Sequence, residues 1–180
     1  VELVGTLVSS VLSANSYVDS NADGVEAFAT VLGSLADNLP DLGEEQQLSV
    51  LNPMATSLAT LETYSETSAT EFAGVVSGLL KSGATTSTAE LISDVVDNML
   101  ESMTYGVVPG QDSIQVDSDS LILCSGKFDF TVERGAPALT IESTSGSEGT
   151  SVAFTPSFEG LNDVSLSLAE FKSHSSSFYN

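Results

Sequence analysis

Oxygen-bearing side chains gather at two places in this sequence where they could bind a cation. In the first, Asp19, Asn21, Asp23 and Gly24 follow the D-x-N-x-D-G spacing of a calcium-binding loop. Such a loop also takes a bidentate Glu at its twelfth position, where this chain has Thr30. The segment therefore predicts an ordinary turn between two helices, in which Asp23 caps the second one. The alternative is a weak calcium site.

The second place is a group of three aspartates, Asp112, Asp117 and Asp119, where the sequence pattern changes from helix to strand. Carboxylate oxygens on loops suit Ca²⁺, and a net charge of −21 attracts any cation. The preferred interpretation is a solvated acidic edge that discourages pairing between strands of different molecules. The sequence thus predicts no cofactor, with calcium as the one alternative.

Groups for nucleophilic catalysis are scarce. The single histidine, His174, lies among serines in a tail without an apolar pattern, where nothing orients its ring against a nucleophile. The single cysteine, Cys124, lies in the apolar run 121–124 and is expected to be a small buried side chain. We predict that the chain is not an enzyme, with a hydrolase based on paired carboxylates as a minor alternative.

The composition excludes several classes of partner. Four Lys and Arg residues stand against 25 Asp and Glu, which excludes nucleic acid and anionic membrane surfaces as partners. No run of 18 apolar residues exists, so we expect no membrane insertion within this chain. With 41% hydrophobic and 16% charged residues, the 180-residue chain can still build a core.

Many serines and threonines and few lysines indicate an extracellular or cell-surface location. No Asn-x-Ser/Thr acceptor occurs, so any glycans are expected to be O-linked. A lone cysteine cannot form an internal disulfide, which leaves packing to stabilise the fold. Because the chain begins at Val1, we expect a processed product or a fragment.

Residues 1–105 carry apolar stripes with helical spacing. These predict five or six short helices, approximately at 3–12, 25–39, 42–51, 53–61, 68–83 and 87–106. Their predicted starts are a capping box at Asp23–Glu26, the N-cap pair Asn52–Pro53, and capping boxes at Ser68–Glu71 and Ser87–Glu90. Their predicted ends are Pro40, Gly83 and Gly106.

Beyond residue 110 the apolar residues alternate, as they do in half-buried strands. About six short strands are expected, around 114–116, 121–123, 128–132, 139–141, 152–154 and 164–168. The predicted fold is therefore α+β, with a helical subdomain at 1–105 and a short antiparallel β subdomain, half of a sandwich, at 106–180. The helix stripes are expected to bury against each other and against one face of the sheet.

This order of elements resembles the receptor-for-egg-jelly and GAIN region of polycystin-1-like proteins and adhesion receptors. The likeness spans about residues 1–135 and includes the strand pattern V-x-S-x-x-L-x-L, occupied by Val116, Ser118, Leu121 and Leu123. The family's sandwich is longer, and its self-cleavage motif places Leu after His, where His174 is followed by Ser. The resemblance implies a non-enzymatic extracellular structural or adhesion module of a large cell-surface or ciliary protein, without self-cleavage.

Two other functions remain as alternatives. Serine-rich strand edges with few charges would also suit a self-assembling subunit of an extracellular filament, such as a flagellar hair. Asp19, Asn21 and Asp23 would instead suit a weak calcium-binding regulatory module. In each case the expected partners are proteins, as neighbouring domains or subunits.

Overall fold

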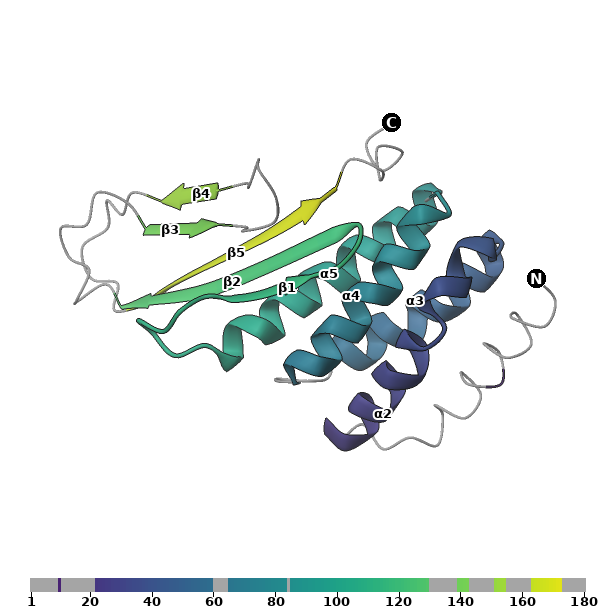
Figure 1. Ribbon diagram of the computed structural model, residues 1–180, viewed down its shortest axis with the longest axis horizontal. Coiled ribbons are helices and arrows are strands. Elements are labelled where there is room, and N and C mark those ends of the chain that lie inside the picture. The colour runs from purple at the N-terminus through teal and green to yellow at the C-terminus, as the bar shows by residue number, and fades with distance from the viewer. Residues whose placement is uncertain are drawn as a thin grey trace.

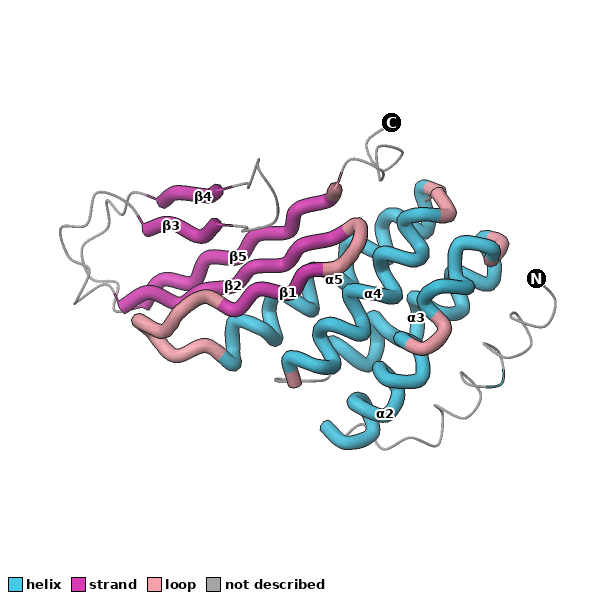
Figure 2. Tube along the Cα trace, in the orientation of Figure 1, coloured by secondary structure: helices cyan, strands magenta, loops and turns pink. Residues whose placement is uncertain are grey.

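The computed structural model describes residues 10, 22–59, 65–83, 85–129, 139–142, 151–154 and 163–172. This part of the chain is an α+β protein, as the sequence predicts, with helices first and antiparallel strands after them (Figure 2). The elements are α2 (Ala22–Gly33), the 3₁₀ helix η1 (Ala36–Asp41), α3 (Glu44–Ala59), α4 (Glu66–Lys81), α5 (Thr86–Gly106), β1 (Ile114–Asp117), β2 (Leu121–Asp129), β3 (Leu139–Glu142), β4 (Ser151–Phe154) and β5 (Asp163–Phe171).

The helices form two layers on one side of a sheet (Figure 1). α5 contacts β2 and β5, and α4 contacts β1 and β2. α2 packs on α4, and α3 packs on α5. α4 and α5 therefore form a middle layer that is covered by strands on one side and by helices on the other.

Three strands make the main sheet, in the order β1-β2-β5, and both pairings are antiparallel. β2 pairs with β1 over four residues and with β5 over nine, from Leu121 opposite Phe171 to Asp129 opposite Asp163. β3 and β4 form a separate two-stranded sheet close to β2 and β5 (Figure 1). The predicted strand segments near 121 and 128 belong to one continuous strand, β2.

A single apolar core joins the helices to the sheet. Alternate residues of the first two strands, Val116, Leu121 and Leu123, belong to the same buried cluster as residues from every described helix. The largest side chains of that cluster with less than 2% exposure are Leu32, Leu39, Leu51, Met54, Leu58, Phe72, Leu79, Leu80, Ile92, Met99 and Leu121. The short helices are therefore stabilised by this packing and not by their own propensity.

The opposite face of β2 is buried too. Ile122 and Cys124 are each 1% exposed and pack with Leu166 and Leu168 of β5 in a second, smaller cluster. The expectation that Cys124 is a small buried side chain is thus confirmed. A strand with both faces buried reads as a continuous apolar run, as residues 121–124 do.

Two of the predicted helix starts are wrong by two or three residues. α4 is capped by Ser65, whose side chain accepts from the Ser68 N–H, so Ser68 lies inside the helix. α5 is capped by Thr85, in a capping box with Thr88. Ser and Thr are frequent in these segments, so several hydroxyls at each helix start offer the same capping chemistry. Gly83 does follow α4 in the left-handed conformation, with φ of +85°, and Gly106 does end α5.

The predictions at Pro40, Pro53 and Asp23 also differ from the structure. α2 ends at Gly33, before Pro40, which lies in η1. Pro53 lies within the continuous helix α3, although its ring removes one backbone hydrogen bond. Buried neighbours such as Met54 hold α3 together across it. Asp23 lies in the first turn of α2, which already begins at Ala22. The described part thus holds four α-helices; the helix predicted at 3–12 lies outside it, apart from Ser10, which is helical.

Close packing of α4 on η1 depends on Gly78. A Cβ atom at that position would lie 2.5 Å from the backbone oxygen of Ala36, whereas a Cβ atom at Gly74 would meet nothing within 4 Å. We expect Gly78→Ala to lower the free energy of unfolding by about 1–3 kcal/mol, because the backbone has to move apart. Gly74→Ala, in the same helix, should raise it by up to about 1 kcal/mol. Urea unfolding of both variants measures these changes, and equal effects would contradict the close packing.

Candidate functional site

The first predicted calcium loop lies mostly outside the described residues. Asp19 and Asn21 are not among them, and Asp23 is an exposed residue in the first turn of α2. Thr30, at the position of the missing twelfth ligand, lies within α2 and donates its hydroxyl to the Glu26 carbonyl. Calcium binding at this loop therefore stays a prediction.

The three later aspartates have separate surroundings. Asp112 is an exposed residue between α5 and β1. Asp117 accepts from Lys172 at 2.7 Å, and Asp119 accepts from Lys81 at 2.6 Å. Among the residues that the structure describes, no three His, Cys, Asp or Glu side chains gather as a metal site requires. The two lysines bind carboxylates that the sequence suggested as metal ligands.

These lysines hold the turn between β1 and β2, residues 118–120, from two sides. Directly after β5, the Lys172 ammonium also donates to the Ser118 carbonyl at 2.6 Å, and the Lys172 N–H donates to the Ser120 carbonyl. From α4, Lys81 reaches Asp119. We call residues 117–120 with these contacts the anchored turn.

Ser77 of α4 makes the most buried contact with the anchored turn. Its hydroxyl lies 2.6 Å from the Ser118 hydroxyl and accepts from the Ser120 N–H at 3.1 Å. Ser118 donates its own proton to the Leu121 carbonyl, so Ser77 is the donor in the hydroxyl pair. Ser77 and Ser120 are 3% and 1% exposed. A helix and a turn 43 residues apart are thus joined by hydroxyl chemistry in a nearly dry environment.

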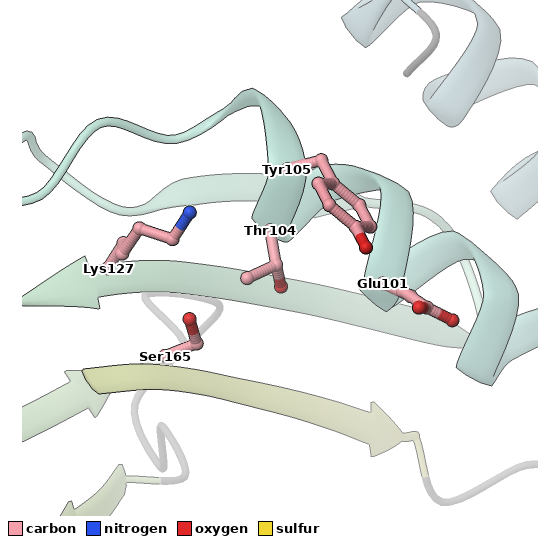
Figure 3. A pocket seen from close by; sticks show the side chains of 5 residues that line it. All are labelled: Glu101, Thr104, Tyr105, Lys127 and Ser165. Carbon is pink, nitrogen blue, oxygen red and sulfur yellow. The ribbon is translucent and has the colours of Figure 1, made fainter. Parts of the chain in front are cut away.

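A hollow of about 340 Å³ opens at the C-terminal end of α5, between that helix and the sheet. Glu101, Thr104 and Tyr105 line it from α5, Lys127 from β2 and Ser165 from β5 (Figure 3). Lys127 and Glu101 lie at opposite ends of this group of side chains, with Thr104 and Tyr105 between them. The hollow therefore offers a cation, an anion, hydroxyls and an aromatic ring.

A cluster of three hydroxyls fixes the helix beside the hollow. Thr104 Oγ1 lies 2.6 Å from Ser125 Oγ and 3.1 Å from Ser167 Oγ. Thr104 donates its proton to the Leu100 carbonyl, so it accepts from the two serines. Ser125 is fully buried. The hollow thus lies beside a group of hydroxyl hydrogen bonds that joins α5 to β2 and β5.

The charges of the hollow are arranged to meet a ligand or solvent. No described carboxylate lies within ion-pair distance of Lys127, in contrast to Lys81 and Lys172. Tyr105 is 60% exposed, and Glu101 and Ser165 are exposed as well. Sequence reasoning missed this group, because its members come from three elements. The scarcity of Lys and Arg, four in the whole chain, is the sequence feature that could have drawn attention to Lys127.

Comparison with known proteins gives no relative: neither the models of protein families nor the curated proteins match this chain. Within its described part, no helix is both long and apolar enough to cross a lipid bilayer. His174 lies outside the described residues.

Removing the Ser77 hydroxyl should weaken the anchored turn. Ser77→Ala leaves the buried Ser120 N–H without its acceptor, so we expect the free energy of unfolding to fall by about 1–3 kcal/mol. Ser49→Ala is the matched control, because the Ser49 hydroxyl bonds only the Gln46 carbonyl of its own helix among the described residues. Its effect should stay within about 0.5 kcal/mol. Urea unfolding followed by circular dichroism measures both, and a neutral Ser77→Ala would show that the contact adds no stability.

The Cys124 thiol should react slowly in the folded protein. Burial, followed by the negative charges of Glu170 and Asp117, raises the pKa of Cys124 from 9.0 to about 11. The thiolate is the reactive form, so labelling at pH 8 should be about 100-fold slower than in urea. Since the folded pKa is the higher one, the stability due to this group is complete below pH 9.0 and is lost as the pH rises toward about 11. Cys124→Ala should remove that part of the pH dependence, and rapid labelling of the native chain would contradict the buried position.

Proposed function

We propose that this chain is a non-enzymatic extracellular structural or adhesion module, which transmits load between neighbouring parts of a large cell-surface or ciliary protein. The observation that carries the proposal is the anchoring of the chain where it leaves the sheet. Lys172 follows directly after β5 and is bound to the anchored turn, which in turn is bound to α4. Tension applied beyond Lys172 therefore reaches the helices as well as the sheet.

The pairing of β5 with β2 supports a load-bearing role. Nine consecutive residue pairs join the two strands, and β2 is buried on both faces. A pull along β5 acts parallel to this ladder, so many hydrogen bonds share the load before any one breaks. The burial of Ile122 and Cys124 on the face away from the helices also supports the half-sandwich arrangement.

The residues that carry the family resemblance lie where the helices contact the sheet. In the pattern V-x-S-x-x-L-x-L, Val116, Leu121 and Leu123 bury against the helices, and Ser118 meets Ser77. The residues of this pattern therefore stabilise the junction of helices and sheet, which favours a module of the receptor-for-egg-jelly and GAIN type. The lysine-poor, hydroxyl-rich composition supports an extracellular location.

The filament alternative depends on the edge of the sheet. Among the described strands of the main sheet, β1 and β5 are the outer ones. β1 has four residues and ends at Asp117, and the nine-residue β5 begins at Asp163 and carries Glu170. Short edge strands with charges are a common protection against pairing with other molecules. The net charge of −21 acts in the same direction.

Stretching single molecules by their two ends tests the load-bearing role. We expect one cooperative step that releases on the order of 50 nm of chain between residues 22 and 172, because one core joins helices and sheet. Lys172→Met should lower the rupture force. Lys81→Met removes an equal charge from a pair whose aspartate is 75% exposed, so it should lower the force less.

Separate low-force steps for helices and sheet, or equal effects of the two lysine variants, would overturn the load-bearing proposal. Sedimentation velocity across a concentration series, with chelator and with millimolar calcium, provides the control. A monomer under all conditions supports the module, whereas calcium-dependent growth into large species supports the filament subunit.

A further inference from the structure

The hollow at the end of α5 has a chemistry that selects one class of small ligand. Its single cation is Lys127, whose ammonium group projects from β2 into the space beside α5 (Figure 3). One lysine matches one carboxylate, with Ser165 beside it as a hydroxyl donor. The other two described lysines are bound to aspartates.

The charge of the whole molecule restricts what that carboxylate can belong to. At a net charge of −21, the field of the protein repels a ligand with excess negative charge. The C-terminal end of α5 adds partial negative charge beside the hollow, so a ligand carboxylate there depends on the Lys127 ammonium to offset that charge. A phosphate or a polyanion is therefore a poor match, whereas a ligand without net charge is not repelled.

The opposite end of the hollow suits a positive group. Glu101 lines that end, with its carboxylate directed away from Lys127 in Figure 3, so a change of its side-chain rotamer turns it toward a ligand. The exposed Tyr105 ring supplies a face on which an ammonium group can rest. The volume of about 340 Å³ is at the small end of ligand sites, which fits a molecule of amino-acid size.

We propose that the hollow formed by Glu101, Thr104, Tyr105, Lys127 and Ser165 binds a small zwitterion, a compound with one carboxylate and one ammonium group. The carboxylate lies on Lys127 and Ser165, and the ammonium lies between Glu101 and the Tyr105 ring. Thr104, fixed by Ser125 and Ser167, holds the helix at a constant distance from the strands. This site is independent of the load-bearing role, which involves the other end of the sheet.

Calorimetric titration of the full chain with a series of linear ω-amino carboxylates, from glycine to 6-aminohexanoate, tests the site. We expect saturable binding with one optimal length, set by the separation of Lys127 and Glu101. Acetate and methylammonium each match half of the site and should bind at least tenfold more weakly than the best zwitterion. Added salt should weaken binding, because the site is open to solvent.

Variants then assign the two ends. Lys127→Met and Glu101→Gln should each weaken binding of the best zwitterion at least fivefold, and Tyr105→Ala more than Tyr105→Phe. Lys81→Met removes the same charge from the anchored turn and should leave the affinity unchanged. Circular dichroism of each variant confirms that it is folded before titration.

Three outcomes would overturn the proposal. The first is no saturable binding by any member of the series. The second is acetate binding as tightly as the best zwitterion, which would indicate a simple anion site. The third is unchanged affinity in both charge variants. If Lys127→Met lowers the melting temperature while the native chain binds no zwitterion, Lys127 serves the end of α5 instead. None of these results bears on the rupture force or the sedimentation behaviour.

Discussion

The anchored turn is the constraint on which the rest of this structure depends. The main sheet has only three strands, and a small sheet is marginal in water unless a helix covers it. Ser77 fixes the turn to α4 at its buried side, and Lys172 fixes β5 to the same turn. This attachment joins the end of the sheet at residues 117–120 both to α4 and to the residue that follows β5.

Local patterns in the sequence predicted the elements but not their exact ends. The spacing of Phe72, Val76 and Leu79 placed α4, and alternation placed all five described strands. The cap at Ser65 is not predicted because Ser68 offers the same hydroxyl, whereas in the structure Ser65 accepts from the Ser68 N–H and Ser68 is buried. The sequence predicts a helix start at Pro53 because a proline removes one backbone hydrogen bond from a helix interior. The packing that compensates for this lost bond involves residues far away in the sequence, so the local pattern does not show it.

The candidate site could not be predicted, because long-range pairing creates it. Thr104 and Ser167 are 63 residues apart, and their meeting depends on the pairing of β5 with β2. Periodicity places a residue on a face of one helix or strand, but it does not say which faces meet. The lysine partners of Asp117 and Asp119 show the same limit, since Lys81 and Lys172 come from distant parts of the sequence.

The joints between helices and sheet are built from uncharged hydroxyls. The Ser77–Ser118 pair and the Thr104–Ser125–Ser167 cluster contain no group that gains or loses a proton in ordinary water. The ion pairs of the turn are partly open to solvent, so changes in acidity or salt concentration act mainly there. The hydroxyl joints therefore keep their hydrogen bonds while the acidic surface is titrated or screened. The connection between helices and sheet does not depend on the ionic composition of the medium at these joints.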